Sequence, residues 1–490
     1  MPEMKRGKRK PARKVKSDGY AKKPVIRRER EEPDMPPVPR GPRSRGEQTN
    51  PTRPHPAEGP RPNPSEGPAD DRRSVVFKSY TPLDTSRLSN VKIPVDPCGA
   101  ASENGVVAMN GNVYLAVSAD DGASFKYFDP TTIFPAFAGG ILGDQQIVYV
   151  PQIDRFVWCM LHGPVAATGD GAFRIAFASS PDVKTKPKSA WSYVDFVASD
   201  IGVKGADFDQ PHLTYSNRNL IIAVDADGKG RVVMRIPLTD LLGGQVSWDF
   251  TAPLTISGNT YQFSAPCGGQ PDGAYMAGHV NTSTMRVFAL LDGSTSYGFH
   301  DVGVWKWSDS DDYSSKTPSG VDWCGRCRSR VSGATWQNGA LWFSWMAPRS
   351  KPGEAPFFPE PQTRVVSISS FSFTKISEMQ VWNPKYAFGY SALAVNSNLE
   401  IGIAVAWGGP NDEADVAVGI LGDYVVWYRD GSTATVDDPG GSKNGRWGDF
   451  LRTHRSNRGG NNFDGFGYFT VKDSSGKLIQ SPYHVRYGRT

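Results

Sequence analysis

The sequence predicts an all-β protein. Composition and a repeated hairpin pattern support this prediction, and an uneven charge distribution separates a basic tail from the rest of the chain. The chain has 490 residues, 38% hydrophobic and 21% charged, so it can bury a large core. Its 52 glycines and 39 prolines disfavour helix interiors and are typical of turns. The 13 Trp, 18 Tyr and 24 Phe favour strands, and together these numbers exclude an all-helical fold.

From about residue 100 onward, a hairpin pattern recurs seven times. Each copy has an alternating segment, a tight Asn, Gly or Asp turn, and a strongly apolar run. Counting back seven or eight residues from each turn gives seven polar positions: Glu103, Asp144, Asp209, Asp272, Arg330, Tyr390 and Asp449. Their successive spacings are 41, 65, 63, 58, 60 and 59 residues. A period near 60 that carries hairpins predicts a β-propeller over residues 74–490, with seven four-stranded blades and six as the alternative.

The first spacing, 41 residues, is short for a complete blade. Blade one is therefore expected to be abbreviated or to borrow a strand across the closure of the ring. Val75–Tyr80 (VVFKSY) is the predicted strand, and it would pair with the last hairpin. Such pairing leaves no open sheet edge at the seam.

Residues 1–73 differ from the rest of the chain. They hold 20 Lys and Arg against 11 Asp and Glu, net +9, which leaves 35 and 39, net −4, for residues 74–490. They also contain 15 of the 39 prolines and few apolar residues, which predicts a disordered basic tail. Lys5–Lys16 has eight cations in twelve residues, so contact with a polyanion such as nucleic acid or an anionic surface is one expectation, and a solvated tail is the other. Removing the tail should then abolish polyanion binding and leave thermal stability unchanged.

Ser118–Phe125 matches the pattern S-x-D-x-G-x-[S/T]-[F/W] at the expected turn between strands three and four of a blade. This segment resembles the Asp-box, or BNR repeat, of sialidase-like β-propellers. Asp120 would accept turn amides, Gly122 would supply a positive φ, and Phe125 would pack over the hairpin. Ser179–Asp182, ending at Trp191, resembles a degenerate second copy. In that family the box is structural, so it bears on fold rather than chemistry.

The innermost strand of each propeller blade begins at the mouth of the central channel, so the seven polar positions are expected to converge there. Gly389–Leu393, followed by Ile401–Ile403, resembles the sialidase segment that carries a tyrosine nucleophile. The resemblance implies a glycoside hydrolase in which Tyr390 is the nucleophile and Arg330 binds a substrate carboxylate. One of Glu103, Asp144 and Asp209 would be the acid/base.

Two other interpretations of the same ring stay open. The preferred one is recognition without catalysis, in which a glycan or a partner protein binds at the channel mouth. The ligand-binding residues would be Asp144, Gln145, Gln210, His212, Asp272, Arg328 and Asp449. Of seven tryptophans that could line such a funnel (Trp323, Trp336, Trp342, Trp345, Trp382, Trp407 and Trp447), five are expected in the core. The other interpretation is structural, because converging carboxylates could hold Ca²⁺ in the channel.

The remaining signals limit compartment and cofactors. Five cysteines, an odd number in a long chain, do not indicate a disulfide framework and fit a reducing compartment. Cys324 and Cys327 have C-x-x-C spacing, but no second pair or His-x-x-His follows for a zinc site. The sequence shows neither an apolar signal segment nor a membrane-spanning run, so we expect a cytoplasmic or otherwise not Sec-exported protein.

Overall fold

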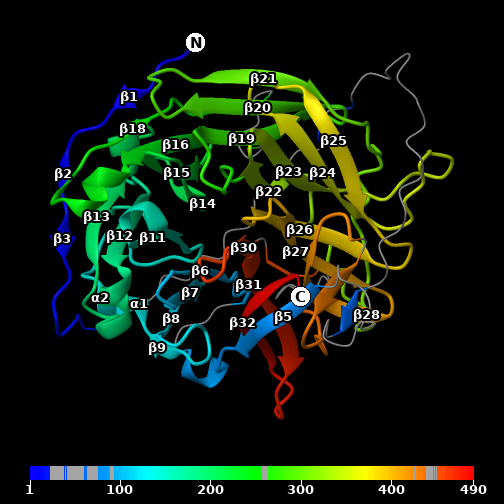
Figure 1. Cartoon of the computed structure of the whole chain (residues 1–490), viewed down its shortest axis with the longest axis horizontal. Coiled ribbons are helices and arrows are strands. Elements are labelled where there is room, and N and C mark those ends of the chain that lie inside the picture. The colour runs from blue at the N-terminus through cyan, green and yellow to red at the C-terminus, as the bar shows by residue number, and fades with distance from the viewer. Residues whose placement is uncertain are drawn as a thin grey trace.

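The computed structural model describes residues 1–21, 38, 40, 60–62, 75–88, 93–256, 263–423, 425–436, 445, 447–448 and 450–489. Within these residues, seven four-stranded sheets stand in a ring around a central axis (Figure 1). The structure is 49% strand and 6% helix. The predicted all-β, seven-bladed propeller is therefore confirmed.

The first three blades run in order along the chain from the hub to the rim. Blade 1 contains β6 (Cys98–Ala101), β7 (Val107–Gly111), β8 (Tyr114–Ser118) and β9 (Lys126–Phe128). Blade 2 contains β10 (Gln146–Val150), β11 (Arg155–His162), β12 (Ala172–Ser179) and β13 (Ser192–Val197). Blade 3 contains β14 (Phe208–Tyr215), β15 (Asn219–Ala226), β16 (Gly230–Pro237) and β18 (Asp249–Phe250), with β17 (Gln245–Val246) beside it. Short helices α1 (Pro130–Ile133) and α2 (Ser180–Thr185) follow β9 and β12.

Blades 4 to 6 follow the same hub-to-rim order. Blade 4 contains β19 (Gly273–Asn281), β20 (Thr284–Leu291) and β21 (Gly298–Gly303) outside an irregular innermost segment, residues 263–268. Blade 5 contains β22 (Val331–Gln337), β23 (Ala340–Ala347), β24 (Gln362–Ser369) and β25 (Lys375–Val381). Blade 6 contains β26 (Ala387–Val395), β27 (Ile401–Gly409), β28 (Asp412–Ile420) and β29 (Val426–Tyr428), with β4 (Arg61–Pro62) parallel to β29.

The irregular segment of blade 4 occupies the place of an inner strand. Ser264 N donates to Ala277 O at 2.7 Å and Cys267 N to Tyr275 O at 2.8 Å, so the segment runs antiparallel to β19. Gly268 forms a parallel bridge to Thr335 of β22, the inner strand of the next blade. Pro266 has no backbone N–H to donate, which explains why this strand is incomplete.

Blade 7 closes the ring with strands from both ends of the propeller sequence. It contains β30 (Arg452–Arg455), β31 (Asn462–Lys472), β32 (Leu478–Arg489) and, at its rim, β5 (Val75–Pro82). β5 pairs antiparallel with β32 from Arg489↔Val75 to Tyr483↔Pro82. The predicted pairing of Val75–Tyr80 with the last hairpin is therefore confirmed.

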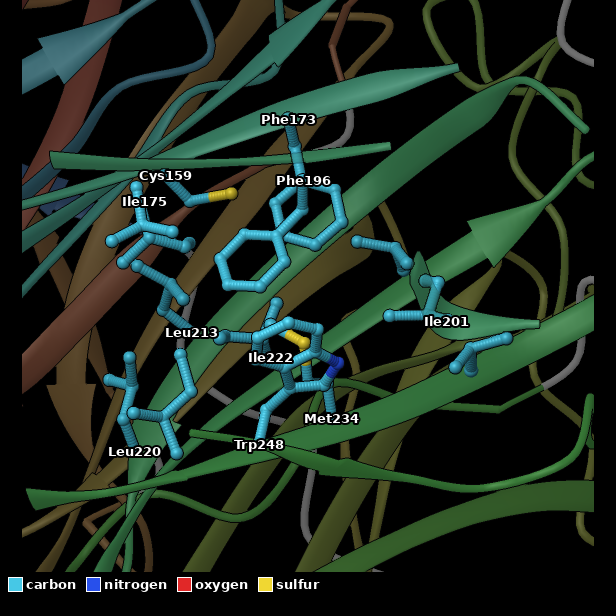
Figure 2. Packing of buried hydrophobic residues seen from close by; sticks show 14 of the residues in the cluster. Cys159, Phe173, Ile175, Phe196, Ile201, Leu213, Leu220, Ile222, Met234 and Trp248 are labelled. Atoms are coloured by element: carbon cyan, nitrogen blue, oxygen red, sulfur yellow. The ribbon is translucent and has the colours of Figure 1, made fainter. Parts of the chain in front are cut away.

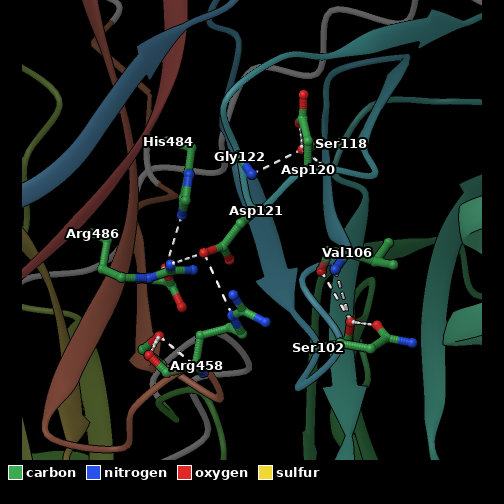
Figure 3. Close-up of polar contacts among 12 residues, drawn as sticks. Ser102, Val106, Ser118, Asp120, Asp121, Gly122, Arg458, His484 and Arg486 are labelled. Carbon is green, nitrogen blue, oxygen red and sulfur yellow. Dashed lines mark hydrogen bonds and ion pairs between the residues drawn. The ribbon is translucent and has the colours of Figure 1, made fainter.

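Polar side chains join blades 7 and 1 at the same seam (Figure 3). Arg486 Nη1 donates to Asp121 Oδ2 at 2.9 Å and its Nε donates to Asp464 Oδ1 at 3.0 Å. His484 Nε2 lies 2.8 Å from the same Asp464 oxygen. Gly122 sits against His484 with φ 86°, and a Cβ there would lie 2.5 Å from His484 Nδ1. The turn that contains Asp121 therefore fixes the two ends of the ring to each other.

That turn, Ser118–Phe125 between β8 and β9, has the local geometry the sequence predicts. Asp120 Oδ1 accepts hydrogen bonds from Ser124 N at 3.0 Å and Ser118 Oγ at 2.7 Å. The hydrogen bond from Ser124 Oγ to Asp120 Oδ2 at 2.6 Å, followed by that from Ser118 Oγ, lowers the pKa of the Asp120 carboxyl. Phe125 is buried in the small core of blades 1 and 7. The loop is thus held by its own side chains.

The hydrophobic core consists of clusters between neighbouring blades. Figure 2 shows the cluster between blades 2 and 3, where Phe173, Phe196 and Trp248 pack with aliphatic side chains from β14, β15 and β16. Five of the seven tryptophans considered for the funnel are buried and two are half-buried, as expected. These five rings fill interfaces between and within blades, where they stabilise the ring rather than meet a ligand.

The first 21 residues lie along the rim of the ring, an arrangement that composition did not predict. The strands β1 (Lys5–Arg6), β2 (Lys10–Pro11) and β3 (Arg13–Lys14) pair with β18, β17 and β13 (Figure 1). This segment, which we call the arm, extends the outer edges of blades 2 and 3. Most of the remaining predicted tail lies outside the described residues.

Candidate functional site

Several predicted residues gather on one face of the ring, at the end where the innermost strands begin. We call it the start face. Asp209, Gln210 and His212 lie on β14, whose ladder shifts register between Asp209 and His212. Arg330 directly precedes β22. Gln210 has φ 47°, a left-handed conformation at a bulge, which turns these side chains relative to a regular strand.

A buried carboxylate joins arginines from two blades at this face. Asp225 is the penultimate residue of β15 and pairs in register with both Asp209 and Arg231. Arg231 Nη1 donates to Asp225 Oδ1 at 2.6 Å, and Arg330 Nη2 donates to Asp225 Oδ2 at 2.7 Å. The side chains of Asp225 and Arg231 are 0% exposed, whereas Arg330 is 19% exposed. Arg330 therefore reaches from blade 5 to blade 3 and keeps an accessible edge.

A third arginine reaches the same place from blade 7. Arg452, at the start of β30, donates through Nε to Gln146 Oε1 of blade 2 at 2.9 Å. Its Nη2 lies 3.1 Å from His212 Nδ1. Because a guanidinium only donates, Nδ1 accepts and Nε2 carries the imidazole proton. None of the described carboxylates forms an ion pair with Arg452, and both Gln146 and His212 are neutral.

The charges of all three arginines act on the imidazole of His212. Burial lowers the pKa of His212 well below its ordinary value, and the charges of Arg231, Arg452 and Arg330 lower it further. His212 is therefore neutral at pH 7. Burial also lowers the pKa of Arg231, against the opposing effect of Asp225 and Asp209. Among the described residues, the guanidiniums of three arginines and the carboxylates of Asp225 and Asp209 therefore act on one another at this place.

Tyr390 lies on the start face three blades along the ring from His212, on β26 of blade 6. Tyr390 has φ 47° and lies where the ladder of β26 shifts register. Gln210 has the same φ at the register shift of β14, so the two inner strands contain the same kind of bulge. Ser391 Oγ lies 3.3 Å from Ser332 Oγ of β22, which places Tyr390 on the strand beside that of Arg330. The ring of Tyr390 is half-buried against the core cluster of blades 6 and 7.

Three other predicted residues belong to this face but have structural partners. Gln145 is buried, and its Oε1 accepts from Trp158 Nε1 at 3.0 Å, so it faces the core. Asp144 has φ 57° and its N–H donates to Asn112 Oδ1 at 2.7 Å. Arg328 turns back to donate to Cys327 O at 2.7 Å. We assign these residues to shaping the face.

Glu103 and Asp272 lie at the opposite ends of their blades, away from the cluster. Glu103 follows β6, in the turn to β7, and its charge acts on Tyr149. Asp272 precedes β19, the second strand of blade 4, and accepts from Tyr275 OH at 2.8 Å. In both blades, the turn from which the polar position was counted joins the second and third strands, whereas in the other blades it joins the first and second. The counted position therefore lies at the start of the second strand. Asp449 lies outside the described residues.

The sequence did not reveal Gln146, Asp225, Arg231 and Arg452, four residues of the cluster. Asp225 and Arg231 flank a tight turn at residues 227–230, on strands two and three of blade 3. The hairpin pattern marks the starts of inner strands and gives no signal for charged residues on second and third strands. Arg452 could have been found, because it lies three residues beyond the counted position in blade 7.

Cysteines and metal ligands form no further centre in the part of the chain that the structure describes. The five cysteines are free and buried. Burial raises the pKa of the Cys324 thiol well above its ordinary value, and neighbouring Cys327 adds to this. No group of three or more His, Cys, Asp or Glu that could hold a metal occurs among the described residues, so the carboxylates proposed for Ca²⁺ are not gathered there. No described helix is long and apolar enough to span a membrane.

Comparisons with known proteins identify structural neighbours only. No family model matches the chain, and no curated protein matches its sequence. Similar solved structures include an α-L-arabinofuranosidase from Fusarium graminearum (10% identity, 81% of this chain and 94% of that chain, TM-score 0.37) and a Trypanosoma rangeli sialidase (10%, 80% and 73%, TM-score 0.39). An α-L-arabinanase from Penicillium chrysogenum matches at 11% identity, 82% and 96% coverage, and TM-score 0.36. At these identities the likeness concerns fold, and activities do not transfer.

Proposed function

We propose that this protein is a recognition propeller that binds a carboxylate-bearing ligand, with a glycan as the preferred class, at the arginine cluster of the start face. The observation that carries this proposal is the meeting of Arg330 and Arg452, from blades 5 and 7, around neutral His212. A planar guanidinium binds a carboxylate through two parallel hydrogen bonds, which favours arginine at such sites. The accessible edge of Arg330 would offer such a contact to an anion.

Binding without hydrolysis fits the arrangement of acidic groups. Asp225 accepts from two arginines and is fully buried, so it holds the cluster together and does not reach a substrate. Glu103, one of three acid/base candidates, lies at the other end of its blade. The ligand would instead be held by charge and hydrogen bonding, with His212 Nε2–H as a further donor.

A glycan array carrying carboxylated, sulfated and neutral glycans tests this proposal. Wild-type protein should bind carboxylated members, and Arg452→Met should lose that signal while keeping the circular dichroism spectrum of a folded β-protein. Equal binding to neutral glycans, or binding unchanged in Arg452→Met, would refute the assignment of the site.

One observation favours a second candidate, a sialidase-like glycoside hydrolase that uses Tyr390. Tyr390 has a left-handed backbone on the strand next to Arg330, and strained backbone is concentrated at functional sites. Turnover of a fluorogenic sialoside by the wild type, lost in Tyr390→Phe, would support the hydrolase. An absence of turnover by protein that binds carboxylated glycans would support recognition alone.

The arm supplies a second contact in this proposal. Its cations would hold the propeller to a polyanion, a largely sequence-independent contact that weakens as salt rises. The charge of Lys5–Lys16 supports this role.

A further inference from the structure

The arm follows the rim in an extended conformation fixed by backbone hydrogen bonds. They are Met4 N to Thr295 O at 2.7 Å, Gly7 N to Trp248 O at 2.9 Å, Ala12 N to Gly244 O at 2.9 Å, Val15 N to Trp191 O at 3.1 Å, and Tyr20 N to Thr132 O at 2.8 Å. The acceptors belong to segments of blades 4, 3 and 2 and, at Thr132, to the link between blades 1 and 2. The arm is therefore attached at intervals along its whole length.

Two side chains and a glycine fix the arm most closely. Lys10 Nζ donates to Asp200 and to Asp195 O at 2.9 Å, and lies 5.2 Å from the centre of the Phe196 ring. Arg13 pairs with Asp195. A Cβ at Gly7 would lie 2.0 Å from Nε1 of the buried Trp248 indole, so only glycine fits there.

Docking divides the eight cations of the arm into two sets. Arg6, Lys10 and Arg13 pair with carboxylates of the propeller. The other five are exposed and form no ion pair with a described carboxylate; they are Lys5, Lys8, Arg9, Lys14 and Lys16, and we call them the arm ridge. At about 3.3 Å per extended residue, the ridge spans about 36 Å.

We propose that the arm ridge, docked on the rim, binds the phosphate backbone of double-stranded nucleic acid. This inference rests on the polyanion contact of the proposed function and assigns it to five defined cations on a fixed edge. Its length matches about ten base pairs. The only aromatic side chain of the arm, Tyr20, is half-buried against the core cluster of blades 1 and 2, so the arm offers unpaired bases no open ring to stack on, which favours contact with the duplex backbone.

The salt dependence of binding to a 20-base-pair DNA tests how many cations take part. Five phosphate contacts predict a slope of log K against log salt of about −4.5, a loss of about 500-fold between 50 and 200 mM salt. A free tail with eight cations predicts about −7, a loss of about 20,000-fold. Gly7→Val keeps every charge but prevents docking of the arm, so it should change the slope from about −4.5 toward about −7.

A matched pair of variants separates the two sets of cations. Lys8→Gln removes a ridge charge and should reduce the slope by about 0.9, whereas Lys10→Gln removes a charge already paired with Asp200 and should leave it unchanged. Equal effects of the two variants, or a wild-type slope near −7, would overturn the docked ridge while leaving the polyanion contact in place. If wild-type protein does not bind the duplex at 50 mM salt, the polyanion contact itself fails, and the ridge fails with it.

Discussion

Asp225→Asn should destabilise the propeller more than Arg330→Met, although both changes break the same ion pair. Asp225 and Arg231 are both 0% exposed, so asparagine leaves a buried guanidinium without its counter-charge. Such a loss costs about 3–5 kcal/mol of unfolding free energy. Arg330→Met keeps the Asp225–Arg231 pair and removes the charge-assisted hydrogen bond to Asp225 at a side chain that is 19% exposed. Its cost should be about 1–2 kcal/mol.

Urea unfolding followed by tryptophan fluorescence measures this difference as a shift in midpoint at constant m-value. The double variant Asp225→Asn/Arg231→Met is the control, because it removes both buried charges. It should recover part of the stability that Asp225→Asn loses. The reasoning would be refuted if Asp225→Asn cost no more than Arg330→Met, or if the double variant lost the full sum of its single changes.

Three further predictions concern the arm, the buried His279 and the seam between blades 7 and 1. Deleting residues 1–21 exposes the edge beside Trp248 and loses the buried Val15, so the unfolding free energy should fall by an amount on the order of 1 kcal/mol, seen as a lower urea midpoint, and tryptophan emission should shift to the red. An unchanged midpoint would show that the arm is not docked. Burial lowers the pKa of His279 in the folded protein to about 3. As the pH falls below about 6.5, His279 is therefore protonated in the unfolded state but not in the folded state. This difference should lower the unfolding free energy by about 2 kcal/mol between pH 7 and pH 5. His279→Phe should remove that part of the pH dependence, and an identical pH profile would contradict it. Gly122→Ala places a Cβ against His484 at a positive φ and should cost about 2 kcal/mol or more in the same unfolding assay, whereas a neutral effect would show that the seam is loosely packed.

The architecture could be predicted from the sequence because strands and tight turns depend on residues that are close together in the chain. Alternation with tight turns identified the hairpins, and Ser118–Phe125 has the predicted turn because its hydrogen bonds lie within eight residues. Val75–Tyr80 could be placed across the seam because a ring must pair its last edge.

The candidate site was harder to predict, because its contacts join residues far apart in the chain. Counting from hairpin turns reached the start of an inner strand at Asp209 and Arg330 but not at Glu103, since in blade 1 the recognisable hairpin is formed by the second and third strands. The link from Arg452 to Gln146 spans 306 residues, and no local pattern marks it.

The docking of the arm could not be predicted from the sequence either. Composition describes residues 1–73 as unable to form a core of their own, and nothing in that composition indicates that Gly7 would fit beneath Trp248. The tail was therefore expected to leave stability unchanged when removed, whereas a docked arm requires a loss. Docking depends on an acceptor edge that exists only once blades 2 and 3 have formed.

The most direct test of the arginine cluster is an affinity measurement by calorimetry with a matched pair of ligands. The carboxylated glycan that gives the strongest array signal is compared with its carboxyl-reduced form on wild-type protein, Arg330→Met, Arg452→Met and the rim control Arg286→Met, whose side chain pairs with Asp301 at 2.7 Å far from the cluster. The account predicts that carboxyl reduction and each cluster variant weaken binding by at least about tenfold, roughly 1.4 kcal/mol, and that Arg286→Met has no effect. Equal affinity of both ligands for all four proteins would contradict it.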